Sequence, residues 1–409
     1  MDGWECTECG TRNGTAATIC VVCFAEPDRP AAAGTPLNAV PVARRPDAGH
    51  PPAVSPPAPA AVTRPRAWKR VLLWATAALV VAGGSAAYVG YTNRDDSSIP
   101  VGDYGDLLSA LAIAPDGQHL FAVRRWHADV SLVRLRDGSV SRVTLPGDFQ
   151  PGSLAVSPDG SRLYVSDGST GDCSGTRMLT VDVTARTVSH TVTTSACRMY
   201  DIVAGPNGAF VYVTTDDGLL AVDTTTDEIV GTVRLPGAGA IAVDPDGRRV
   251  HVAVRGPEPA LAVVSATTLG IAGLVPLVDT SGTPMSPEGL DLAPDGSTVY
   301  VACSFHDEAG KPIDRPGMVS VVDPASGTVA ANLPLPGKQP RDVAVSPDGT
   351  RVYVANWGSG SVSMVMAAAG TVETVADVGG NPTDLAVSPD GRTVYVTTYA
   401  EKIAVVDAG

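Results

Sequence analysis

The chain has 409 residues, a net charge of −14 and abundant glycine (43) and proline (34), whereas aromatic residues make up only 5%. This length exceeds that of one ordinary compact domain but suits a single unit built from repeats. Acidic residues outnumber basic ones chiefly after residue 91. The large C-terminal part would therefore repel phosphate backbones, which excludes nucleic acid as its expected partner.

Four cysteines in the first 26 residues form two C-x-x-C pairs, and they are Cys6, Cys9, Cys20 and Cys23. Two such pairs can surround one tetrahedral Zn²⁺ as thiolates, and a segment with so few apolar residues would need the metal in order to fold. Disulfides are the alternative, but they do not suit the reducing cytoplasm expected at this end of the chain. We predict a structural zinc site in residues 1–26.

The pattern W-x-C-x2-C-x3-N-x6-C-x2-C, from Trp4 to Cys23, resembles zinc fingers of the Ran-binding-protein type. Members that bind single-stranded RNA carry arginines and a stacking aromatic residue between the cysteine pairs, where this chain reads GTAATI. Members that bind ubiquitin carry Thr-Phe after the second cysteine, where this chain has Gly10 and Thr11. The resemblance therefore implies a small docking module for an unidentified cytoplasmic protein.

Residues 27–67 are rich in proline and alanine, which predicts a disordered, extended linker. Residues 71–91 contain no charged residue and, as a helix, would cross a bilayer core of about 30 Å. Basic residues between positions 64 and 70 precede this segment, and Asp95 and Asp96 follow it. A buried core helix and a cleaved signal peptide are the alternatives, although a signal peptide has a much shorter leading region. We predict a single-pass anchor in the cell membrane with a cytoplasmic N-terminus.

Residues 97–409 contain a repeated four-residue turn. Proline presets the first turn dihedral, Asp or Asn accepts the second position, and glycine accepts the left-handed conformation, so each copy predicts a hairpin. The copies are APDG (114–117), SPDG (157–160), GPNG (205–208), DPDG (244–247), APDG (293–296), SPDG (346–349) and SPDG (388–391). Four short strands around each of seven turns predict an all-β, seven-bladed β-propeller.

The last repeat ends after its third strand, and residues 97–101 resemble the fourth strands of the other repeats. We predict that residues 97–101 pair with residues 403–406. Such pairing would close the ring and cover an exposed strand edge.

The stretch RVYVANWGSGSVSMV (351–365), preceded by AVSPDG, resembles the YVTN-type β-propeller repeat, and related units cover residues 97–409. Proteins of this type include surface-layer and adhesion-like binding proteins, lactonase-like hydrolases and a lyase that acts on a cyclic antibiotic. The resemblance therefore implies the fold without choosing among these functions.

Asp201, Asp342 and Asp384 each lie five residues before a turn proline, at the start of the strand predicted to be innermost. Three carboxylates at one end of the propeller axis could bind Ca²⁺. The alternative is that each carboxylate accepts hydrogen bonds from neighbouring backbone amides. The loops between second and third strands should add to the same ligand face, and their candidate residues are His306, Asp307, Glu308, Asn356 and Trp357.

Cys173 and Cys197 should lie on the same face of one repeat, and outside the cell they could form a disulfide. The sequence as a whole predicts a membrane-anchored, extracytoplasmic propeller that acts as a binding or sensing platform for an unidentified protein or small molecule. The alternative is a lactonase-like or lyase-type enzyme for a small cyclic substrate, with His306 and Asp307 or Glu308 as catalytic residues.

Overall fold

The computed structural model describes residues 98–102, 107–168, 175–307, 309–399 and 402–408, and the backbone of residues 4–5 and 12–13. The chain divides into two compact units, residues 1–92 and 93–409. In the first unit, β1 (Trp4–Glu5) pairs antiparallel with β2 (Arg12–Asn13). The cysteine quartet, the linker at 27–67 and the apolar segment at 71–91 lie outside the described residues. Within the described ranges, no helix combines the length and apolar character that a membrane span requires.

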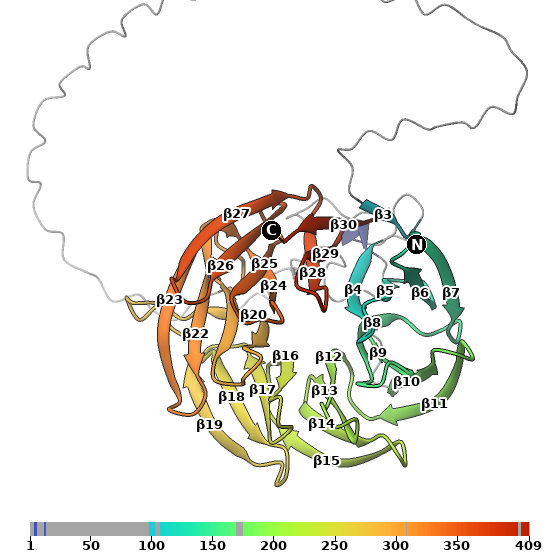
Figure 1. Ribbon diagram of the computed structural model, residues 1–409. Coiled ribbons are helices and arrows are strands. Elements are labelled where there is room, and N and C mark those ends of the chain that lie inside the picture. The colour runs from blue at the N-terminus through green and yellow to red at the C-terminus, as the bar shows by residue number, and fades with distance from the viewer. Residues whose placement is uncertain are drawn as a thin grey trace, which may run out of the picture. The chain divides into compact units, whose positions relative to one another are not determined.

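The second unit is a ring of four-stranded antiparallel sheets, of which the described residues form seven (Figure 1). This arrangement confirms the predicted seven-bladed β-propeller. The strands of the first four blades are β4 (Leu108–Ile113), β5 (His119–Arg124), β6 (Asp129–Arg134) and β7 (Ser139–Thr144); β8 (Pro151–Val156), β9 (Arg162–Asp167), β10 (Thr176–Asp182) and β11 (Thr187–Thr194); β12 (Met199–Ala204), β13 (Phe210–Thr215), β14 (Gly218–Asp223) and β15 (Glu228–Arg234); and β16 (Ala238–Val243), β17 (Arg249–Val254), β18 (Ala260–Ser265) and β19 (Ile271–Pro276). The strands of the last three are β20 (Ser286–Leu292), β21 (Val299–Ser304), β22 (Pro316–Asp323) and β23 (Thr328–Lys338); β24 (Pro340–Val345), β25 (Arg351–Asn356), β26 (Ser361–Met366) and β27 (Thr371–Asp377); and β28 (Pro382–Val387), β29 (Thr393–Thr398), β30 (Lys402–Asp407) and β3 (Ser98–Pro100).

The repeated turns join the first and second strands of every blade. Each turn also packs against the turn of the preceding blade. In the first blade, Gly117 has a φ of 65° and its N–H donates to the carbonyl of Ala114 at 2.9 Å. Each turn glycine lies against the turn proline of the preceding blade, from Gly160 against Pro115 round to Gly117 against Pro389. The same contact therefore runs around the whole ring and returns to its start.

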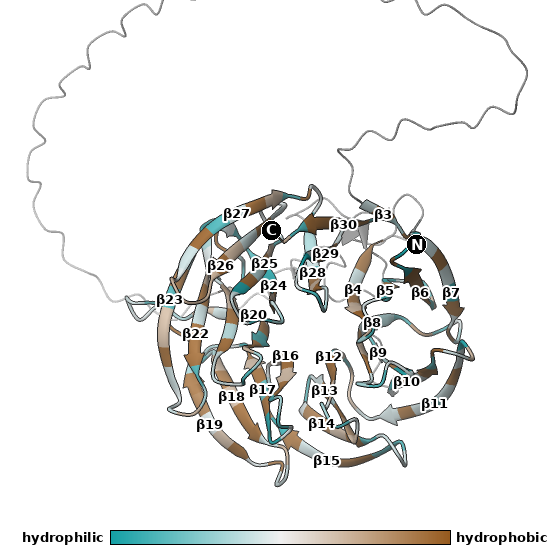
Figure 2. Ribbon diagram, viewed as in Figure 1, coloured by the Kyte–Doolittle hydropathy of each residue, from teal (hydrophilic) through white to brown (hydrophobic). Residues whose placement is uncertain are grey.

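The core lies between the blades, because each sheet packs its apolar face on the next sheet. One buried cluster joins Phe121 and Val123 of the first blade to Leu163 and Leu179 of the second. Figure 2 shows apolar residues along the strands of all the blades rather than at one central point. The second strands are buried almost throughout, as in β25 and β29.

The ring closes through β3, which pairs antiparallel with β30 (Figure 1). Ser98 lies opposite Ala404, Ile99 opposite Ile403 and Pro100 opposite Lys402. The predicted closure of the ring by this segment is confirmed, but its partners are residues 402–404 rather than the predicted 403–406, with the register centred on Ile403. Val101, only 2% exposed, follows β3 into a cluster that contains Leu108 of the first blade.

Candidate ligand-binding face

The propeller has two different faces. The innermost strands begin on the face that also carries the loops between second and third strands, which we call the loop face. They end at the Pro-Asp-Gly or Pro-Asn-Gly turns on the opposite side, which we call the turn face. The described propeller residues that were predicted from the sequence to bind a ligand lie near the loop-face ends of strands or in loops of this face.

The three aspartates predicted at the start of the innermost strands connect neighbouring blades. Asp201 accepts a hydrogen bond from the backbone N–H of Ile241 at 3.1 Å, and Ser153 Oγ donates to it at 2.8 Å. In the same way Leu385 N–H donates to Asp342 at 3.1 Å, and Leu111 N–H donates to Asp384 at 2.8 Å. Each backbone donor belongs to the innermost strand of the next blade, whereas Ser153 belongs to that of the preceding blade. These carboxylates therefore act as cross-blade acceptors, which was the alternative to a cation site.

Burial raises the pKa of Asp201, Asp342 and Asp384, because a carboxylate loses solvation between packed strands. The pKa of Asp384 rises to about 6, and the neighbouring charge of Asp384 raises that of Asp342 further. No three His, Cys, Asp or Glu residues among those described are grouped as metal ligands would be. Calcium binding at this end of the axis stays a prediction.

A fourth inner-strand carboxylate, Asp291, was not predicted from the sequence, because it lies three rather than five residues before its turn proline. The backbone N–H groups of Leu292 and Val345 each donate to it at 2.8 Å, so it too bridges two blades. Burial raises its pKa to about 6, and these two hydrogen bonds offset only part of that effect.

Substitution of Asp291 by Asn should change how stability depends on pH. The pKa of Asp291 is raised from 3.8 to about 6 in the folded state, so the folded protein holds a proton there that the unfolded chain has lost. The wild type should therefore lose about 1–3 kcal/mol of stability at this site as the pH rises from about 4 to above 6. Denaturant unfolding across this pH range should show no such loss of stability in Asp291→Asn. The control variant Asp217→Asn, at an exposed position, should lose stability as the wild type does. An Asp291→Asn profile identical to that of the wild type would contradict the prediction.

A group of charged side chains lies at the loop-face end of blades four to six, around Glu288 at the start of β20. Arg255, which follows β17, places Nη2 3.4 Å from Glu288 Oε2, and Arg341 of β24 places Nη1 3.6 Å from the same oxygen. The other oxygen, Oε1, accepts from Ser304 Oγ at 2.8 Å and lies 4.0 Å from His306 Nε2. We call Arg255, Glu288, Arg341 and His306 the arginine cluster.

Burial alone would raise the pKa of Glu288, but Arg255 and Arg341 outweigh that effect and hold it below its ordinary value. Burial lowers the pKa of His306, and the two guanidinium groups lower it further against the opposing effect of Glu288. At neutral pH the arginine cluster therefore contains two guanidinium cations, one carboxylate and a neutral imidazole. It carries an excess of positive charge within a strongly acidic protein.

The remaining predicted residues of the loop face differ in their roles. Trp357 is half-buried, and the Cζ atom of Arg341 lies 5.5 Å from the centroid of the Trp357 ring. The rings of Trp357 and Tyr399 pack edge to face, with their centroids 6.2 Å apart. Asn356 is fully buried and donates to Ser363 Oγ at 2.8 Å, so it does not face a ligand. The carboxylate of Asp307 accepts from two N–H groups of its own loop, and Glu308 lies outside the described residues.

Sequence reasoning missed Arg255, Glu288 and Arg341. Glu288 and Arg341 occupy the position six residues before the turn proline, where the other blades have Ser, Gly, Tyr, Gly and Thr. Charged residues of opposite sign at this position in two adjacent repeats are the signal that could have found them. Arg255 has no such signal, since it lies in a loop of variable length.

The cysteines of the propeller are described in part. Cys197 takes part in a disulfide bond, but Cys173 lies outside the described residues, so their pairing stays a prediction. Cys303 is a free, fully buried thiol, and burial raises its pKa to about 12. It is therefore an inert core residue.

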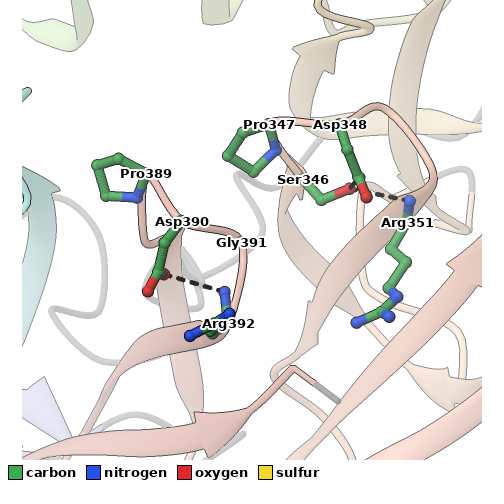
Figure 3. Close-up of a pocket in the computed structure, with 8 residues that line it drawn as sticks. All are labelled: Ser346, Pro347, Asp348, Arg351, Pro389, Asp390, Gly391 and Arg392. Atoms are coloured by element: carbon green, nitrogen blue, oxygen red, sulfur yellow. Dashed lines mark hydrogen bonds between the residues drawn. The ribbon is translucent and has the colours of Figure 1, made fainter.

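A surface pocket on the turn face lies between the turns of the last two blades (Figure 3). Hydrogen bonds within the two turns occupy its aspartates: Ser346 Oγ donates to Asp348 at 2.6 Å, and the backbone N–H of Arg392 donates to Asp390 at 3.1 Å. Hydrogen bonds from Ser346 and from Thr350 lower the pKa of Asp348 to about 2. These groups stabilise their own turns, so we place the candidate site on the loop face instead.

Comparison with known proteins supports the fold. No family model matches the chain, and neither does any curated protein sequence. The solved structure of hydrazine synthase from Kuenenia stuttgartiensis is similar with a TM-score of 0.63 and 19% sequence identity, over 78% of this chain and 99% of that chain. At this identity the likeness shows a shared β-propeller architecture and carries no information on activity.

Proposed function

We propose that this protein is a membrane-anchored binding platform whose extracytoplasmic propeller recognises a ligand on its loop face. The observation that supports this proposal is the arginine cluster, in which side chains from three blades gather at one end of the propeller axis. A site at the end of the propeller axis can combine residues from several blades, because the innermost strands of all the blades surround the axis.

The remaining parts of the proposal rest on the sequence. The apolar segment at 71–91 would serve as the single-pass anchor, and the basic residues before it would keep the N-terminus in the cytoplasm. The cysteine quartet would bind a structural Zn²⁺ and form a docking module for a cytoplasmic protein. The antiparallel pairing of β1 with β2 supports this part, since Cys6 and Cys9 lie between these strands in the sequence.

An enzymatic function is the second candidate, and one observation favours it. His306 lies 4.0 Å from Glu288, and its lowered pKa keeps the imidazole neutral and able to accept a proton. The catalytic pair would then be His306 and Glu288, in place of His306 with Asp307. Loss of a lactone or ester turnover in His306→Ala, with binding retained, would favour the enzyme.

The proposal can be tested by thermal unfolding of the full chain in detergent with a panel of small anionic, neutral and cationic compounds. We expect some compounds to raise the melting temperature of the wild type but not that of Arg341→Ala. The control is Arg392→Ala, an exposed arginine of the turn face, which should respond like the wild type. A panel without effect, or equal stabilisation of Arg341→Ala, would contradict the proposal.

A further inference from the structure

The two guanidinium groups of the arginine cluster lie near Glu288, but Glu288 does not occupy all of their hydrogen-bond donors. Both approach the same oxygen, Oε2, at 3.4 and 3.6 Å. Close, charge-assisted hydrogen bonds between guanidinium and carboxylate groups are about 2.7–2.9 Å long and are often bidentate. Glu288 therefore orients Arg255 and Arg341 but leaves much of their hydrogen-bonding capacity unused.

The donors that remain point to an additional acceptor. A guanidinium group has about five N–H donors in a planar fork. Arg255 donates through Nε to the Pro287 carbonyl at 3.1 Å and through Nη2 to the Glu288 carbonyl at 3.3 Å. Among the described residues, Arg341 has only its ion pair with Glu288 and its stacking on Trp357. The side chains of Arg255 and Arg341 are 39% and 36% exposed, so their remaining donors can reach a molecule from solvent.

Both arginines are fixed in place before any ligand arrives. The Cζ atom of Arg255 would lie only 3.2 Å from a Cβ at Gly239, so the guanidinium occupies space that this glycine leaves open. Arg341 is held between Glu288 and the ring of Trp357. Preorganised donors lose little entropy when they bind, and that favours affinity.

We propose that the arginine cluster binds a monocarboxylate that carries an aromatic or apolar group. The carboxylate would accept hydrogen bonds from Arg255 and Arg341, and the apolar group would lie against Trp357 and Tyr399. A single negative charge matches the excess positive charge of the cluster, whereas a phosphate dianion would bring additional negative charge close to Glu288. This inference rests on the proposed function and specifies the ligand class for the same site.

The test measures binding of benzoate to the full chain in detergent by calorimetry, with benzamide as the neutral probe of the same shape. Benzoate should bind and benzamide should not. Arg255→Ala and Arg341→Ala should each weaken benzoate binding by about tenfold or more, as expected for loss of a charge-assisted contact. Glu288→Gln should strengthen binding, because it removes the competing carboxylate. Arg392→Ala should have no effect.

Several outcomes would overturn the inference. Benzoate binding that is unchanged in Arg341→Ala would mean that the carboxylate binds elsewhere. Tighter binding of inorganic phosphate than of benzoate would mean that the proposed anion class is wrong. Benzamide binding that is lost in Arg341→Ala would overturn the carboxylate while leaving the loop-face binding platform intact. If benzoate, benzamide and phosphate all failed to bind, both the carboxylate inference and the proposed loop-face binding platform would be overturned. If Arg341→Ala does not fold, Arg341→Lys serves instead: it keeps the charge but lacks the planar fork, and it should also weaken benzoate binding.

Discussion

Deletion of Ser98–Val101 should lower the free energy of unfolding of the propeller by about 4–6 kcal/mol. The deletion removes the β3 pairing with β30 and the burial of Val101, each of which contributes a few kcal/mol. It also removes the hydrogen bond from Arg142 Nη2 to the Val101 carbonyl at 3.1 Å, which ties the closing segment to the outer strand of the first blade. Thermal unfolding should show a melting temperature lower by roughly 10 °C.

Two point substitutions separate closure from a general effect of shortening the chain. Val101→Asp should destabilise strongly, because it would place an unpaired charge in the cluster with Leu108 and Ile403. Pro100→Ser should be nearly neutral, since Pro100 is exposed and lies on an edge strand. Equal melting temperatures for the deletion variant and the wild type would mean that β3 does not close the ring.

Glu288→Gln should destabilise the propeller by about 2–3 kcal/mol while it improves anion binding. The substitution keeps the shape and an acceptor for Ser304 but leaves Arg255 and Arg341 without their shared counter-charge. Removing one member of a buried ion pair costs about 3–5 kcal/mol, and the partial exposure of the arginines reduces this figure. Denaturant unfolding measures the first effect and benzoate titration the second.

The control for this prediction is Glu258→Gln, which changes an exposed glutamate in the loop between β17 and β18. It should alter neither stability nor benzoate affinity. Opposite signs for stability and affinity in Glu288→Gln are the signature of a carboxylate that restrains two ligand-binding cations. If Glu288→Gln lowered both stability and benzoate affinity, Glu288 would only support the local fold.

The blade architecture could be predicted from the sequence because its causes are local. Each Pro-Asp-Gly turn sets its own dihedrals, and each turn glycine must also leave room for the proline of the preceding blade, as Gly117 does for Pro389. The same residues thus satisfy a local and a tertiary requirement in every repeat. The closing strand could be predicted because it supplied the one strand that the last repeat lacks.

The candidate site could be predicted only in part, because its chemistry depends on contacts between blades. The position of Asp342 near the start of an innermost strand could be predicted. Its hydrogen bond from the N–H of Leu385 in the next blade could not, because it depends on how the blades pack. Arg255 and Glu288 are 33 residues apart in the sequence and meet only because blades four and five pack together. His306 was selected with its sequence neighbours, whereas its charged partner, Glu288, comes from another strand.

The closing strand also determines how the propeller would respond to tension. A pull on the chain before Ser98 is borne first by β3, which is held to β30 by three residue pairs and to the first blade through Val101. The other six blades are each built from one continuous stretch of chain, so they are not loaded directly. Mechanical force applied from the N-terminal side would therefore open the ring at the seam between its last and first blades before it unravelled any other blade.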